Sequence, residues 1–80
     1  MKQKLAVALV VAELESANDK FLLFNSAHEG YAVLKEEVDE LWDEIKANKK
    51  PGSVLRQKEE AIQVAAMAIK FVMSCTKEHL

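Results

Sequence analysis

The sequence predicts an all-α domain of three helices that forms an oligomeric helical bundle with further copies of itself. Two Gly and one Pro among 80 residues leave few places for turns, which favours a few long helices over many short strands. Half of the residues are hydrophobic and 30% are charged, as in an ordinary globular domain, so residues 1–80 are expected to form one unit. Such a short chain buries only a modest core, and one cysteine allows no internal disulfide. Assembly is therefore the expected source of further burial.

Net charge and cysteine content narrow the class of protein. A net charge of −2 gives no indication of a nucleic-acid or membrane-surface partner. The single cysteine, Cys75, fits a reducing, cytoplasmic setting. The apolar run 5–12 follows two lysines and loosely resembles a signal peptide, yet it is shorter than the roughly 20 residues that cross a bilayer. It continues without a turn signal into residues 13–24, so we expect a buried helix, with a cleaved leader as the alternative.

The first helix is expected over residues 4–20, which contain neither Gly nor Pro. Residues 5–12 are apolar on every side of that helix, which predicts burial from several directions. The second helix is expected to begin after Ser26, because Ser26 and Glu29 have the spacing of a capping box, and to end near Ala47. Its apolar stripe consists of Tyr31, Leu34, Val38, Leu41 and Ile45, widened by Trp42.

A loop is expected over residues 48–53, where Pro51 and Gly52 turn the chain and Ser53 caps a third helix over residues 54–76. The short connection makes the second and third helices antiparallel neighbours. The third helix has two apolar stripes on nearly opposite sides, so we expect this chain to cover one and a second copy to cover the other. The stripes are Leu55, Ile62, Ala66, Ile69 and Met73 on one side, and Val64, Met67 and Phe71 on the other.

Oxygen-bearing side chains on the second and third helices are the candidates for chemistry. Glu37 and Glu40 stand one turn apart on one flank of the second helix. Glu60 follows 20 positions after Glu40, in line with an apolar stripe, where a carboxylate is costly unless it is paired or metal-bound. Gln63, one turn after Glu60, adds a further oxygen. Hard cations such as Mg²⁺ prefer ligands of this kind, while a solvated acidic face is the alternative interpretation.

Two segments that contain these residues, LKEEVDEL at 34–41 and EEAIQ at 59–63, resemble the MazG-like nucleoside triphosphate pyrophosphohydrolases. That all-α family carries an ExxE motif on one helix and an ExxD motif on the next. Glu37 and Glu40 match the first motif, and Glu60 matches the Glu of the second, whereas Gln63 stands where the family has Asp. The segments at 28–34 and 63–68 look like small members of phage and prophage type. The resemblance covers about half of the chain.

The resemblance implies hydrolysis of a nucleoside or deoxynucleoside triphosphate to the monophosphate and pyrophosphate, by a homodimer or homotetramer. The expected metal is Mg²⁺, with Mn²⁺ as the alternative, and the implied ligands are Glu37, Glu40, Glu60 and Gln63. No catalytic residue is assigned beyond these ligands.

Gln63 replaces the Asp of the second family motif, and an amide brings no charge and cannot act as a base. Whether this chain is active is therefore left open by the resemblance. Glu44 is the residue best placed to compensate, and Arg56 and Lys58 are candidates for contacts with phosphates. The alternative is a catalytically degenerate MazG-like oligomer that serves as a structural or partner-binding module. A third hypothesis is a partner-binding helix bundle unrelated to nucleotides.

Overall fold

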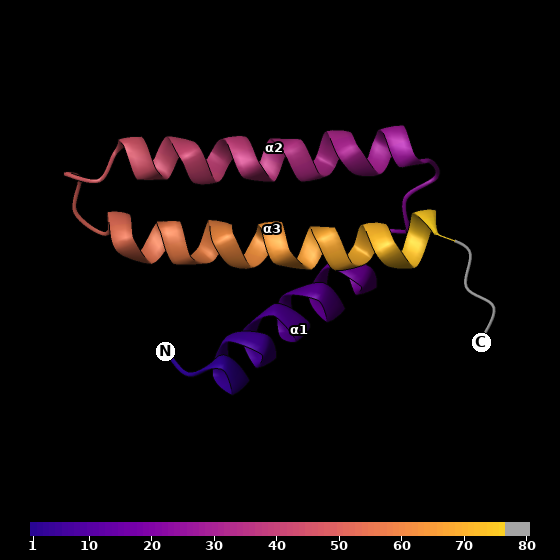
Figure 1. Ribbon diagram of the computed structural model, residues 1–80, viewed down its shortest axis with the longest axis horizontal. Helices are drawn as coiled ribbons and strands as arrows, with labels where there is room; N and C mark the ends of the chain where they lie inside the picture. The colour runs from indigo at the N-terminus through magenta and orange to yellow at the C-terminus, as the bar shows by residue number, and fades with distance from the viewer. Residues whose placement is uncertain (77–80) are drawn as a thin grey trace.

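A computed structural model describes residues 1–76, which form three α-helices: α1 (Gln3–Lys20), α2 (Ala27–Lys46) and α3 (Ser53–Cys75). α2 and α3 lie side by side as an antiparallel hairpin, and α1 crosses obliquely and packs against α3 rather than α2 (Figure 1). The predicted all-α class is confirmed, and each helix boundary lies within one residue of its expected place. No helix within residues 1–76 combines the length and the apolar character that crossing a membrane requires.

The start of α2 is fixed by side-chain hydrogen bonds. The Ser26 hydroxyl accepts a hydrogen bond from the backbone N–H of Glu29 at 3.1 Å, which confirms Ser26 as the N-cap. The Glu29 carboxylate accepts from the backbone N–H and from the side-chain amide of Asn25, each at 3.2 Å, rather than from the N–H of Ser26. Glu29 therefore holds the connection between α1 and α2 one residue further back than a capping box does.

Ser53 does not cap α3 with its side chain, so that prediction is wrong. Gly52 occupies the N-cap position with φ of 77°, a left-handed conformation that glycine adopts without strain. The buried Ser53 hydroxyl instead donates to the backbone carbonyl of Glu44 at 3.2 Å and accepts from the Gln57 amide at 3.1 Å. It therefore ties the first turn of α3 to the last turns of α2.

The core is small and lies where the connection between α1 and α2 meets α3. Phe24, Ala66 and Met67 are buried, and half-buried side chains from all three helices surround them. Gly30 is buried on α2, where an added Cβ would come within 2.7 Å of Phe71 and 3.0 Å of Phe24. The absence of a side chain at Gly30 therefore lets both rings pack against α2.

Much of the predicted apolar burial is missing from the single chain. α1 has no buried residue, and Leu5 is 54% exposed, so the expected burial of residues 5–12 from several directions is wrong within one copy. On α2, Tyr31 and Trp42 are 62% and 55% exposed. On α3, the stripe with Met67 is covered within the chain. The other stripe is covered at Ala66, whereas its outer members stay exposed, namely Leu55, Ile69 and Met73.

Gly30→Val is expected to destabilise the fold because the new side chain would displace Phe71 and Phe24. Overpacking of this kind costs about 1–3 kcal/mol of unfolding free energy. For a domain of this size, that loss lowers Tm by at least about 4 °C. Thermal unfolding followed by circular dichroism measures the change.

Ala32→Val is the matched control, since Ala32 lies two residues away on the exposed side of α2. That change carries only the helix-propensity cost of valine, roughly 0.5 kcal/mol. Equal losses of Tm in the two variants would show that Gly30 has no special packing role.

Candidate metal centre

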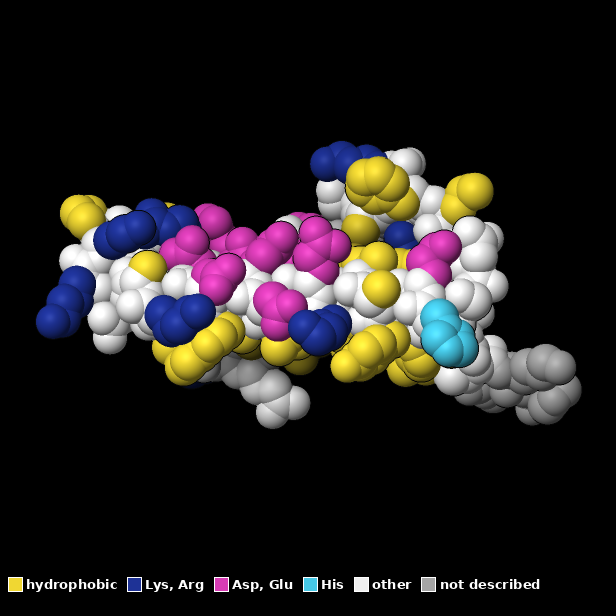
Figure 2. Space-filling view, turned by 90° about the horizontal axis from the view of Figure 1, so that it is seen from above, with side chains coloured by type: hydrophobic (Ala, Val, Ile, Leu, Met, Phe, Trp, Pro, Cys, Tyr) yellow, Lys and Arg dark blue, Asp and Glu magenta, His cyan; other side chains and the backbone are white. Residues whose placement is uncertain are grey.

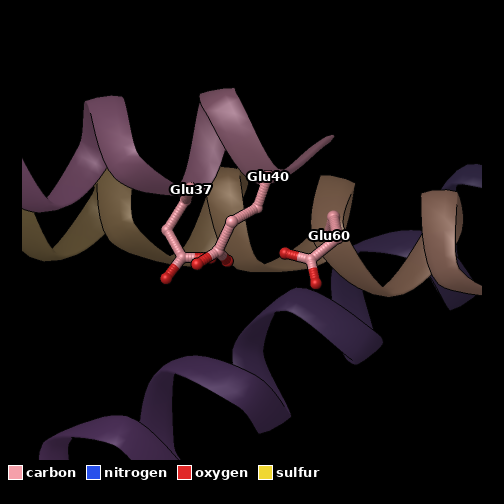
Figure 3. Close-up of side chains that lie close together, drawn as sticks. All are labelled: Glu37, Glu40 and Glu60. Carbon is pink, nitrogen blue, oxygen red and sulfur yellow. The ribbon is translucent and has the colours of Figure 1, made fainter. Parts of the chain in front are cut away.

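Three glutamates converge between α2 and α3. Glu37 and Glu40 extend from successive turns of α2, and Glu60 reaches toward them from α3 (Figure 3). One carboxylate oxygen from each residue lies within 4.8 Å of the others. The structure therefore brings together the three carboxylates that the sequence analysis selected.

The hairpin explains how residues 20 positions apart become neighbours. The turn around Gly52 reverses the chain between α2 and α3, and the Ser53 hydrogen bond to Glu44 sets the register of the two helices. The one-turn spacing of Glu37 and Glu40 then places both on the flank of α2 that meets Glu60. Figure 2, which looks down on α2, shows further Asp and Glu side chains gathered over the middle of the same face.

Burial and neighbouring negative charge raise the pKa values of two of these carboxyl groups, those of Glu37 and Glu60. Burial, followed by the neighbouring Glu40 and Glu60 charges, raises the pKa of Glu37 from 4.5 to about 7. Burial and the Glu40 charge likewise raise the pKa of Glu60. Within residues 1–76, none of the three forms an ion pair with Lys or Arg. The cluster therefore concentrates negative charge that a bound cation could neutralise.

One oxygen of the cluster has no partner. Oε2 of Glu60 is shielded from solvent, and no donor in the described part of the chain forms a hydrogen bond with it. A buried carboxylate oxygen without a donor is costly. A proton or a metal ion at this oxygen would remove the cost, so the geometry fits an oxygen-ligated divalent cation.

Gln63 lies one turn after Glu60 on α3 and is half-buried. It lines a cavity of about 490 Å³ together with Glu37. Gln63 and Glu37 therefore border the same cavity. As a neutral ligand Gln63 would add coordination without charge.

None of the residues expected to assist the cluster is placed in it: Glu44 and Arg56 pair with each other, and Lys58 is exposed. Glu44 accepts a hydrogen bond from Nε of Arg56 at 2.9 Å, so each of these residues neutralises the other. Glu44 therefore does not join the three converging carboxylates. Lys58 is exposed on α3 and does not line the cavity beside Glu37.

Lys70 is the residue of this region that sequence reasoning missed. It is only 2% exposed and lines the cavity two turns beyond Gln63. A signal was present, because Lys70 is the only charged residue in the apolar stretch 61–76. A lone lysine within such a stretch indicates a buried cation or one that points into a pocket. The other polar residues that line the cavity are Glu13, Ser16, Lys20 and Glu29.

Comparison of the chain with family models, curated proteins and solved structures finds no match in any of the three.

The metal-free chain is expected to lose stability as pH rises. Between pH 4.5 and about 7 the folded Glu37 carboxyl binds its proton more tightly than the unfolded one, so unfolding releases protons. Tm should therefore fall across this window and stay low above pH 7. Mg²⁺ should raise Tm at pH 8 but not at pH 5, because metal ligation requires deprotonated carboxylates.

Thermal unfolding of Glu37→Gln tests the origin of this effect. The variant should show a weaker pH dependence than the wild type, with a higher Tm at pH 8. Glu15→Gln, an exposed carboxylate on α1, is the control and should leave the wild-type profile unchanged. A wild-type Tm that rises steadily from pH 5 to pH 8 without metal would contradict the raised pKa of Glu37.

Proposed function

We propose that this chain is a Mg²⁺-dependent nucleoside triphosphate pyrophosphohydrolase of MazG-like type. The observation that carries the proposal is the convergence of Glu37, Glu40 and Glu60 within 4.8 Å, without a lysine or arginine partner among residues 1–76. The matching ExxE motif and the Glu of the second motif support it from the sequence.

The chemistry follows from the ligands. A divalent cation held by the three carboxylates would neutralise charge on phosphate oxygens and favour attack by water. Water adds to the α-phosphorus, the bond from that phosphorus to the bridging oxygen breaks, and pyrophosphate leaves. Glu37 also borders the cavity, which is large enough to hold the remainder of a nucleotide.

A second candidate function rests on Gln63. With an amide in place of the family's Asp, this chain offers three charged ligands instead of four. A MazG-like bundle that has lost its chemistry and acts as a structural or partner-binding module would carry such a substitution.

Both candidate functions, the enzyme and the structural module, involve self-association of the chain. The accessible surface of the chain is 6158 Å², whereas a compact monomer of 9.0 kDa exposes about 4,900 Å². Hydrophobic side chains run along the lower edge of the face in Figure 2. Tyr31, Val38, Trp42 and Ile45 on α2 are each more than 40% exposed. A homodimer or homotetramer would cover this apolar surface.

The activity is tested by pyrophosphate release from a panel of nucleoside triphosphates with Mg²⁺ or Mn²⁺. Glu37→Gln should lower kcat/KM by about 100-fold, because a lost metal ligand costs several kcal/mol and each 1.4 kcal/mol is about tenfold. Glu15→Gln is the control and should keep the wild-type rate. Chelation with EDTA should abolish the reaction.

Comparison of the wild type with Gln63→Asp separates the two candidate functions. In an enzyme it should tighten metal binding by about tenfold or more, since a fourth charged ligand is added, and pyrophosphate release should persist. A wild type without pyrophosphate release and without a metal-dependent rise in Tm would favour the structural module.

Sedimentation at micromolar concentration tests the assembly. The wild type should sediment as a dimer or tetramer, and Trp42→Glu should shift it toward the monomer because the new charge opposes burial of the α2 surface. Asp43→Asn, at the neighbouring exposed polar position, is the control and should leave the association unchanged. A folded wild-type monomer at this concentration would contradict the proposal.

A further inference from the structure

Lys70 is a buried cation without a carboxylate partner in residues 1–76. Its ammonium nitrogen lies 5.1 Å from the ring centroid of Phe24 and 5.9 Å from that of Phe21. The aromatic faces attract the cation, yet they accept none of its hydrogen bonds in the way an oxygen does. An occupant of the cavity that offers an oxygen acceptor would therefore satisfy Lys70.

Hydrogen bonds hold one of these rings beside Lys70. The Ser74 hydroxyl accepts from the backbone N–H of Phe24 at 3.0 Å and donates to the backbone carbonyl of Lys70 at 2.7 Å. The connection that carries Phe21 and Phe24 is thereby fixed to the end of α3. Lys70 and the two rings form a prearranged wall of the cavity.

The same cavity reaches the carboxylate cluster. Gln63 and Lys70 both line it and stand seven residues apart on α3, a rise of about 10 Å along the helix. A nucleoside unit spans such a distance from its phosphate to the far edge of its base. Phosphates at Glu37 would therefore leave the base beside Phe24, Met67 and Lys70.

The charges around the cavity decide what kind of group Lys70 meets. Three glutamates and two lysines line it; Glu37 belongs to the carboxylate cluster, and the charges of the remaining two glutamates and two lysines balance. Walls without a net charge do not attract a free anion, whereas a neutral ring with a carbonyl oxygen needs no such attraction. The apolar side chains of Phe21, Phe24 and Met67, which also line the cavity, suit such a ring.

From this arrangement we infer that the Lys70 end of the cavity is the base subsite, and that Lys70 selects bases with a carbonyl oxygen at the edge it meets. The inference rests on the proposed nucleotide function. A lysine ammonium has three donors and no acceptor, so it pairs with the O4 atom of uracil or thymine and with O6 of guanine. The amino groups at the same ring positions of cytosine and adenine would face it donor to donor.

The experiment compares kcat/KM for UTP with CTP and for GTP with ATP, because the members of each pair place a carbonyl or an amino group at the position in question. The wild type should prefer the carbonyl member by at least about tenfold. Lys70→Met keeps the apolar stem and removes the donors, and should reduce both preferences to less than about threefold. Lys70→Arg retains donors and should keep the sign of each preference.

Lys58→Met is the matched control, since this lysine is exposed on α3 and lies outside the cavity. It should retain the wild-type preferences. Hydrolysis of all four nucleotides at similar kcat/KM by the wild type would overturn the base subsite and leave the proposed function standing. The absence of hydrolysis of any nucleotide would overturn the proposed function and this inference with it. If Lys70→Met fails to fold, the base preferences of the wild type and of Lys70→Arg test the inference.

Discussion

The close antiparallel packing of α2 against α3 is the constraint on which the rest of the molecule depends. Gly30 permits the approach, since Phe71 and Phe24 occupy the space that a side chain there would need. At the other end of the hairpin, Ser53 bonds to the backbone of Glu44 and sets the register. Between these two points one carboxylate oxygen each of Glu37, Glu40 and Glu60 lies within 4.8 Å of the others. Burial, together with the neighbouring Glu40 and Glu60 charges, raises the pKa of Glu37 in this position.

The glutamate cluster lowers the stability of the metal-free fold and favours the binding of a cation. Three neighbouring carboxylates, two of them partly buried, make the metal-free chain less stable at neutral pH than a chain with neutral side chains there. The same crowding supplies a set of oxygen ligands that needs little reorganisation. Cation binding would therefore offset the repulsion between these carboxylates and stabilise the fold.

The features that depend on local sequence rules could be predicted. Helix boundaries followed from Ser26, Pro51 and Gly52, and the pairing of Glu37 and Glu40 with Glu60 followed from the short loop between two long helices. The actual role of Ser53 could not be predicted, because its hydrogen bond to Glu44 depends on how the two helices pack. Burial was overestimated for residues 5–12 because periodicity shows which surface is apolar, not whether one copy covers it. Lys70 was overlooked for a related reason: its cavity is formed by segments distant in the sequence.

The position of α1 has a consequence for access to the cavity. α1 and the connection after it form one side of the cavity, while α2 and α3 form the other. α1 has no buried residue and packs on α3 alone, so its attachment is weaker than the packing between the other two helices. Local opening in proteins starts at the elements with the least buried apolar contact. Opening at α1 would therefore disturb the α2–α3 hairpin, and the carboxylates that it carries, less than any separation of α2 from α3.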